Sequence, residues 1–278
     1  MISSRAAGSP GCHAAPGRAR ALRWLVGGAL VLAPCTAATA QLTVDQLSIV
    51  FRLTPGEPRL GVLTLRNDSD QPLQAMIGLH DWDRNLDGTN QWHALGTVPG
   101  SCGDALEVFP PTVNLPPGGT QAIRITIDST FRPERECWAA AMIETAAPPP
   151  SSGMSVVHRM RTATKIYVQP PGVAPIGAVE GLRVGAMSIQ GDSVRAVEVV
   201  VANTGGQHFE GQVELQIRTP DNQVVEALPL PTAYVLGGAR VRVRAAFPDL
   251  PPGRYLLLAV VDYGGAELAA GQIEYRVP

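Results

Sequence analysis

The stretch GVLTLRNDSDQPLQAMIGL (61–79) contains two runs of alternating apolar and polar residues, joined by a polar turn that opens at Asn67. Alternation with a period of two is typical of β-strands that bury one face. The second half of the chain repeats this plan in VEVVVANTGGQHFEGQVEL (197–215), again with an asparagine at the turn. PPGGTQAIRITI (116–127) has a similar counterpart in LGGARVRVRAAF (236–247). The repeat predicts two tandem β-domains of the same general kind.

Most of the remaining chain also alternates, and turn-forming residues such as Pro, Gly, Asn and Asp separate the runs. No stretch keeps the apolar spacing of an amphipathic helix over three turns, so the sequence predicts an all-β fold of two sandwiches. A single closed sheet is the alternative. The predicted strands are 42–51, 61–67, 72–82, 122–127, 137–145 and 156–168 in the first half, and 181–189, 194–205, 211–219, 239–247, 253–263 and 271–277 in the second.

The first forty residues have the features of a cleavable export signal. Four arginines and no acidic residue accompany an apolar run, WLVGGALVLA (24–33), and ATAQ (38–41) offers an Ala-x-Ala site for cleavage after Ala40. The run is shorter than the ~20 residues that a membrane-spanning helix needs. We therefore predict a signal peptide (1–40) and an exported mature chain with no membrane span.

A proline-rich segment, PPGVAPIG (170–177), divides the predicted mature chain, because proline stiffens a linker and removes hydrogen-bond donors. The expected domains are 41–169 and 178–278.

The leader holds four of the 22 basic residues and none of the 24 acidic ones, which leaves the mature chain with a net charge of −6. This charge argues against nucleic acid as a partner.

Two cysteines, Cys102 and Cys137, remain once the leader is removed. A single pair in an oxidising compartment predicts a disulfide bond, since a metal-binding or redox pair normally has closer spacing.

Motifs of catalysis are absent from the sequence. There is no G-x-S-x-G nucleophile elbow, no H-E-x-x-H zinc motif and no glycine-rich phosphate loop. We therefore expect neither an enzyme nor a cofactor, with a hydrolase built from loop carboxylates as the alternative.

One polar segment, Asp83–Gly88, has the D-x-N-x-D-G spacing with which a calcium loop begins. Such a loop is closed by a bidentate glutamate six residues after the glycine, and here that position is Ala94. The favoured interpretation is a turn between two strands, formed by Asn, Asp and Gly. A weak calcium site on Asp83, Asn85 and Asp87 is the alternative.

Residues 42–170 resemble the N-terminal domain of the PapD-like periplasmic chaperones of pilus assembly, an immunoglobulin-fold family. The second half resembles that family only as another immunoglobulin-like sandwich, so the expected fold is two tandem immunoglobulin-like β-sandwich domains. The similar segments are LTVDQLSIVF (42–51), GVLTLRNDSDQPLQAMIGLHDW (61–82), LEVFPPTVNLPPGGTQAIRI (106–125), PERECWAAAMIETAAPPP (133–150) and TKIYVQP (164–170).

The resemblance implies how a partner would bind. In the family, the last strand of the first domain adds its edge to an incomplete pilin subunit, and a lysine at its end pairs with a carboxylate of the subunit. The matching strand here is 154–168, and the matching lysine is Lys165, the only lysine in the sequence. The side chains expected to enter the subunit are Met154, Val156, His158 and Met160.

One position departs from the family pattern. The family has a second basic anchor in its first strand, and the matching position is Ser48, with Arg52 four residues further on.

The expected function is a periplasmic chaperone for pilus-like subunits, working with secreted pilin-like proteins and an outer-membrane usher. The alternative is a non-catalytic envelope or surface protein built from two immunoglobulin-like domains.

Overall fold

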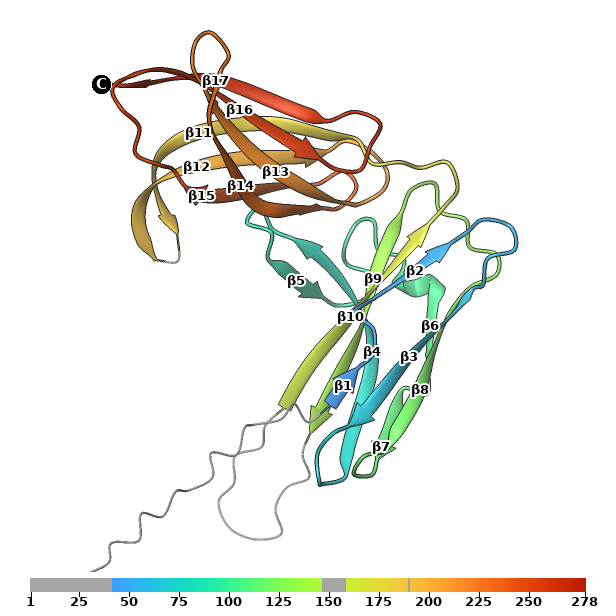
Figure 1. Ribbon diagram of the computed structural model, residues 1–278. Coiled ribbons are helices and arrows are strands. Elements are labelled where there is room, and N and C mark those ends of the chain that lie inside the picture. Colours follow the sequence, from blue (N-terminus) through green and yellow to red (C-terminus); the bar gives the residue numbers. More distant parts are fainter. Residues whose placement is uncertain (1–41, 147–158, 190) are drawn as a thin grey trace, which may run out of the picture. The chain divides into compact units, whose positions relative to one another are not determined.

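The computed structural model describes residues 42–146, 159–189 and 191–278 (Figure 1). The predicted signal peptide and three of the predicted partner-binding residues (Met154, Val156 and His158) lie outside these ranges. The described chain forms two β-sandwiches of two sheets each, with one short 3-10 turn, η1 (Gly103–Ala105). The prediction of an all-β, two-sandwich fold is confirmed.

The first sandwich contains one four-stranded and one six-stranded sheet. The smaller sheet has the order β1 (Leu42–Val44), β3 (Leu60–Asn67), β8 (Thr120–Ile127) and β6 (Leu106–Phe109). The larger sheet has the order β2 (Ser48–Arg52), β10 (Arg159–Gln169), β9 (Cys137–Ala146), β4 (Leu73–Arg84) and β5 (Asn90–His93), and β7 (Thr112–Leu115) also pairs with β4.

The second sandwich contains a three-stranded and a four-stranded sheet. The three-stranded sheet has the order β11 (Gly177–Ile189), β12 (Asp192–Asn203) and β15 (Arg240–Ala246). The four-stranded sheet has the order β14 (Val224–Val235), β13 (Phe209–Arg218), β16 (Gly253–Asp262) and β17 (Ala269–Val277).

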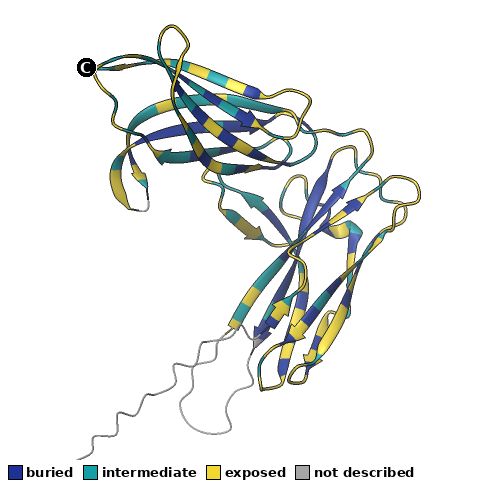
Figure 2. Cartoon of the chain, in the orientation of Figure 1, coloured by how far each residue is buried: buried dark blue, intermediate teal, exposed yellow. Residues whose placement is uncertain are grey.

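Each sandwich has its own hydrophobic core, built from the inward-facing residues of alternating strands. In the first core, Leu63 and Leu65 of β3 lie two residues apart and are fully buried. In the second core, Val199 and Val201 of β12 are likewise two residues apart and fully buried. Figure 2 shows this alternation of buried and exposed residues along the strands. Burial of one such aliphatic side chain stabilises a fold by roughly 1.5–3 kcal/mol.

The two asparagines of the sequence repeat have equivalent roles. Asn67 is fully buried, and its Nδ2 donates to the carbonyls of Gln71 (2.8 Å) and Leu115 (3.0 Å). Asn203 is 1% exposed, and its Nδ2 donates to the carbonyls of Gln207 (2.7 Å) and Val235 (3.3 Å). Each side chain therefore ties its own turn to a neighbouring strand.

A glycine completes each of these turns. The amide of Gly118 donates to Asn67 O (3.0 Å), and that of Gly238 donates to Asn203 O (3.0 Å). Both glycines have positive φ angles, 68° and 77°, which favour glycine over other residues. The similarity of 116–127 and 236–247 in sequence thus reflects one turn that is built twice.

The predicted strand 42–51 is two strands in the structure. β1 pairs with β3 in one sheet, whereas β2 pairs in parallel with β10 in the other. The apolar alternation changes phase at the break, because Leu42 is buried at an even position while Ile49 and Phe51 are buried at odd ones. The chain crosses between the layers there, held by the amide of Thr64, which donates to the Asp45 carboxylate (2.8 Å).

The sequence did not predict strand β14. Pro229 and Pro231 interrupt its pattern, and proline cannot donate a hydrogen bond within a sheet. β14 pairs with β13 alone and therefore lies at the edge of its sheet, where proline is tolerated.

The predicted disulfide bond between Cys102 and Cys137 is confirmed, with a Cα–Cα distance of 5.6 Å. It joins the start of η1 to the first residue of β9. Two tryptophans of this sandwich are buried: Trp82 is fully buried and Trp138 is 6% exposed.

Candidate functional site: a cationic pocket at Lys165

The last strand of the first sandwich, β10, is paired on both sides only in its second half. It pairs with β9 from Arg159 to Val168, but with β2 only from Lys165 to Gln169. Within the described residues, the part of β10 before Lys165 has a strand on one side alone, apart from a hydrogen bond from Thr164 Oγ1 to Gln46 O (2.7 Å). An unpaired edge offers backbone donors and acceptors to an incoming strand.

Lys165 lies where this free edge ends. It is opposite Ser48 in the parallel pair of β10 and β2, and its amide donates to Leu47 O (2.9 Å). The resemblance had aligned Ser48 with a basic anchor of the first strand, and the structure places Ser48 beside Lys165. Arg52 is four residues further along β2, opposite Gln169.

Aromatic side chains form the wall against which the lysine lies. The Lys165 ammonium is 4.7 Å from the centre of the Trp82 ring, within the range of a cation–π interaction. Tyr167 meets the same indole edge-on, with ring centres 6.0 Å apart. Trp82 is fixed in turn, because its Nε1 donates to Ala139 O (3.0 Å) and its carbonyl accepts from Trp138 Nε1 (2.8 Å).

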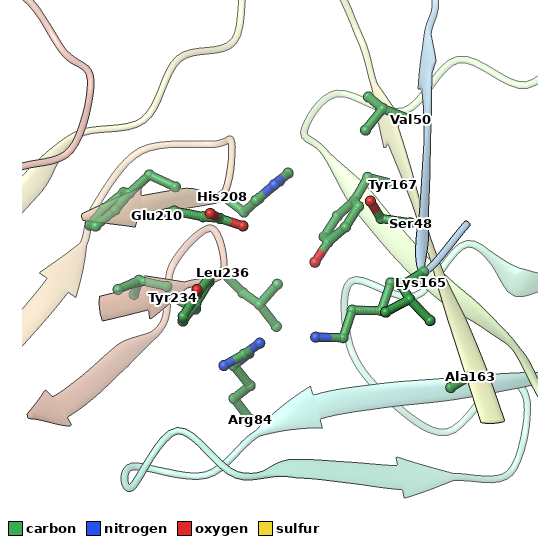
Figure 3. Close-up of a pocket in the computed structure, with 13 residues that line it drawn as sticks. Ser48, Val50, Arg84, Ala163, Lys165, Tyr167, His208, Glu210, Tyr234 and Leu236 are labelled. Carbon is green, nitrogen blue, oxygen red and sulfur yellow. The ribbon is translucent and has the colours of Figure 1, made fainter. Parts of the chain in front are cut away.

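The lysine points into a pocket of about 400 Å³ that residues of both sandwiches line (Figure 3). Arg84, the last residue of β4, enters the same pocket, with its guanidinium directed toward the lysine ammonium. The lining residues are Leu47, Ser48, Val50, Arg84, Ala163, Lys165 and Tyr167 of the first sandwich and His208, Phe209, Glu210, Tyr234, Val235 and Leu236 of the second.

The electrostatics of the pocket disfavour its own cations. Burial, and then the positive charge of Arg84, lower the pKa of Lys165 from 10.5 to about 8, against the opposing effect of Glu210. Burial also lowers the pKa of Arg84. For Tyr167, burial raises the pKa, so its hydroxyl stays protonated at neutral pH. An anionic group in this pocket would therefore be stabilised by two positive charges.

A buried carboxylate beside the pocket joins the two sandwiches. Glu136 is 3% exposed, and its Oε1 accepts hydrogen bonds from the amide of His208 (2.9 Å) and lies 2.7 Å from the imidazole Nδ1. Its Oε2 accepts from Gln169 Nε2 (2.8 Å). The His208 ring stacks on Tyr167 with centres 4.0 Å apart, so this contact also orients one wall of the pocket.

The candidate calcium segment forms the turn between β4 and β5. The amide of Thr89 donates to Asn85 Oδ1 (2.9 Å), and Gly88 adopts a positive φ of 79°. Asp83 instead lies 3.1 Å from His93 Nε2, and Asp87 accepts from Arg242 Nε (2.8 Å). The three oxygen-bearing side chains thus have three separate partners, which is the arrangement of a turn.

Two of the predicted partner-binding residues lie within the described chain. Lys165 is in the pocket, whereas Met160 is partly buried and packs against the core of the first sandwich. Its insertion into a partner stays a prediction. Sequence reasoning missed Arg84, Glu210 and Tyr167, because no spacing in the sequence reveals that the ends of β4 and β10 and the start of β13 meet in one pocket.

Comparisons with known proteins find similar folds only. No family model and no curated protein matches the sequence. The class 5 fimbriae chaperone CfaA is 14% identical, with a TM-score of 0.49 over 85% of this chain and 99% of that one. A chain of the CFA/I chaperone–tip adhesin complex is 12% identical, with a TM-score of 0.48 over 82% of this chain and 97% of that one.

A third solved structure, the CsuC–CsuE chaperone–tip subunit complex from Acinetobacter baumannii, is 15% identical, with a TM-score of 0.46 over 84% of this chain and 98% of that one. Among the residues that the structure describes, there is no helix of the length and hydrophobicity that a membrane crossing requires.

Proposed function

We propose that this protein is a periplasmic chaperone that binds pilus-like subunits through the edge of strand 154–168 and holds a carboxylate of the subunit with Lys165. The observation that carries the proposal is the half-paired strand β10, whose free edge ends at the cationic pocket. A subunit that lacks a strand exposes unpaired backbone groups and part of its apolar core. A strand added from the chaperone pairs with the backbone groups through its free edge and covers the core with its side chains. Secreted pilin-like subunits are the proposed partners, with an outer-membrane usher as a further one.

The proposed role of Lys165 is to fix the register of the added strand. A one-residue shift would move every side chain to the opposite face of the sheet, so an added strand needs a fixed reference point. A charge-assisted hydrogen bond to a terminal carboxylate supplies one, because it is stronger than a bond between neutral groups. The sequence resemblance around TKIYVQP (164–170) supports the same role.

One observation favours the alternative of a structural envelope protein. Arg159 and Arg161 are exposed on the free part of β10, and Arg161 pairs with Glu144 of the neighbouring strand. Charged side chains on an edge strand are a common way to prevent pairing with other chains. In that case the edge would capture no subunit.

Capture from periplasmic extract tests the proposal. Tagged wild-type protein and a Lys165→Ala variant are incubated with the periplasmic extract of the producing cells, and the retained proteins are identified by mass spectrometry. We expect the wild-type protein to retain small β-sandwich subunits that lack a strand, and to protect them from protease. The variant should retain at least about tenfold less, because a charge-assisted hydrogen bond is lost.

A matched control removes a positive charge elsewhere. Arg124 is exposed on β8, in the other sheet of the first sandwich, and Arg124→Gln should capture as wild type does. Capture of the same subunits by Lys165→Ala at wild-type yield would show that the anchor is wrong. Capture of no incomplete subunit by the wild-type protein would favour the structural alternative.

A further inference from the structure

The strand with the free edge is basic, although the protein as a whole is acidic. Residues 145–179 include Arg159, Arg161 and Lys165 and contain no aspartate or glutamate. The predicted mature chain, by contrast, has a net charge of −6. A partner that pairs with β10 therefore meets a local charge opposite in sign to the net charge of the protein.

The three cationic side chains lie on one face of β10. Side chains alternate between the two faces of a strand, so Arg159, Arg161 and Lys165 share a face. The other face is the one that packs against the core, because Ile166 and Val168 are fully buried there. Both arginines are exposed, and both belong to the part of β10 that precedes its pairing with β2.

The same two arginines carry backbone groups that face the free edge. The amide of Lys165 points toward the side of β2, since it donates to Leu47 O (2.9 Å). Backbone groups of alternate residues point to the same side of a strand, so those of Ala163, Arg161 and Arg159 face the free edge. A strand that bonds to these groups lies directly beside the two guanidinium groups.

The chain itself neutralises little of this charge. Arg161 pairs with Glu144 of β9, and Arg159 takes part in no ion pair of the described residues. Residues 147–158, outside the described ranges, have no acidic residue in their sequence. A guanidinium has five N–H donors, so Arg161 can bind a second carboxylate while it keeps Glu144.

We infer that the strand accepted by β10 is acidic on one face, with carboxylate side chains opposite Arg159 and Arg161. This inference rests on the proposed function and adds to it the chemistry of the partner strand. A strand that covers the free edge and ends with its terminal carboxylate at Lys165 runs parallel to β10, as β2 does beyond Lys165. Arg161 and Arg159 precede Lys165 by four and six residues. The acidic residues are therefore expected at the fourth and sixth positions before the C-terminal residue of the partner.

The two arginines make the edge selective. Opposite charges on neighbouring strands stabilise a sheet, and like charges destabilise it. A basic strand is thus repelled, a neutral strand gains nothing, and an acidic strand is favoured, which combines attraction of one partner with rejection of others. Charges that keep most chains from pairing at an edge can in this way admit one class of chain.

Short synthetic peptides of threonine and valine test the inference. The probe has a free C-terminus and glutamate at the fourth and sixth positions before its last residue. Matched peptides carry glutamine or lysine at those positions, and an isomer of the same composition has both glutamates moved by one residue. Binding is followed by NMR of the ¹⁵N-labelled protein, in which the amides of residues 159–164 report the site.

We expect the glutamate peptide to bind about five- to tenfold more tightly than the glutamine peptide, and the lysine peptide to bind more weakly than both. The isomer should bind no better than the glutamine peptide, because a shift of one residue turns its carboxylates to the other face. General attraction between unlike charges would favour the probe and its isomer equally.

Paired variants make the result specific. Arg159→Gln with Arg161→Gln should bind the glutamate and glutamine peptides equally, and Arg159→Glu with Arg161→Glu should prefer the lysine peptide. A reversed preference cannot arise from loss of folding. The control is Arg254→Gln with Arg276→Gln, which removes two exposed arginines that are opposite each other on β16 and β17 and should keep the wild-type preference.

The outcomes separate this inference from the proposed function. Equal affinity of the wild-type protein for the glutamate and glutamine peptides at residues 159–164 would overturn the inference, while strand addition would stand. If the glutamate preference is found but an amidated C-terminus binds as well as a free one, the arginines are correct and the anchor at Lys165 is wrong. If no peptide shifts the amides of residues 159–164, both fail.

Discussion

The two sandwiches share a turn but differ in what surrounds it. In both, a buried asparagine and a glycine with positive φ join two strands by the same set of hydrogen bonds. Only the first contains the disulfide bond and the half-paired strand β10, and Lys165 and Arg84 both belong to it. The shared features thus maintain the fold. The features found only in the first sandwich supply the free strand edge and both cations of the candidate site, although residues of both sandwiches line its pocket.

The disulfide bond gives the largest expected difference in stability between the two sandwiches. Replacement of Cys102 and Cys137 by alanine opens a loop of 35 residues and should lower the free energy of unfolding by about 3–4 kcal/mol in the chain-entropy model. Only the first sandwich should be affected. Its unfolding is followed by tryptophan fluorescence, because Trp82, Trp92 and Trp138 all belong to it, and unfolding of both sandwiches is followed by circular dichroism.

The circular dichroism signal of the second sandwich provides the control. Its transition in denaturant should be the same in the double variant as in the wild-type protein. An equal shift of both transitions would mean that the sandwiches unfold as one unit.

The shared asparagines give the next largest effect. Asn67→Ala and Asn203→Ala each leave buried carbonyls without their donor, which should cost about 2–3 kcal/mol of unfolding free energy. Denaturant unfolding should show the loss in the first sandwich for Asn67 and in the second for Asn203. Effects that differ by more than a factor of two would show that the two turns are not energetically equivalent.

The smallest effect is the pH dependence caused by Lys165. Its pKa is about 8 in the folded chain and ordinarily 10.5, so above pH 8 the unfolded chain holds this proton more strongly. Stability therefore rises with pH between about 8 and 10 as the unfavourable buried charge is removed. Below pH 8, Lys165→Met should be the more stable protein, and its advantage should shrink as the pH rises.

Urea unfolding of wild-type protein and Lys165→Met at pH 7 and pH 10 measures this difference, with tryptophan fluorescence as the signal. Tyr167 is present in both proteins, so its own titration largely cancels. A difference that is the same at both pH values would contradict the lowered pKa of the lysine.

Much of the fold could be predicted from local patterns in the sequence, because each such pattern depends on residues that are neighbours in the chain. The Asn-led turns and the alternating strands have this property. The disulfide bond joins residues 35 apart and was predicted because only two cysteines remain once the leader is removed. The break between β1 and β2 was missed, although the change of phase between Leu42 and Ile49 was a readable signal. β14 was missed because Pro229 and Pro231 argue against a strand unless its position at an edge is known.

The candidate site was only partly predictable. Lys165 was found through the resemblance and its uniqueness in the sequence. Arg84 belongs to a segment whose acidic neighbours, Asp83 and Asp87, suggested a metal loop. In the structure Asp87 pairs with Arg242 while Arg84 turns into the pocket, a division that depends on which strands meet and not on local spacing.

The two prolines of β14 have a consequence for self-association. A sheet edge can template the growth of a polymer, and two residues without an N–H group deny a neighbouring molecule the bonds that it would need there. Growth by strand addition is therefore hindered at this edge of the second sandwich, while β10 keeps a free edge in the first. Residues 159–164 of β10 contain no proline, so of these two edges β10 is the one that offers a row of backbone donors uninterrupted by proline.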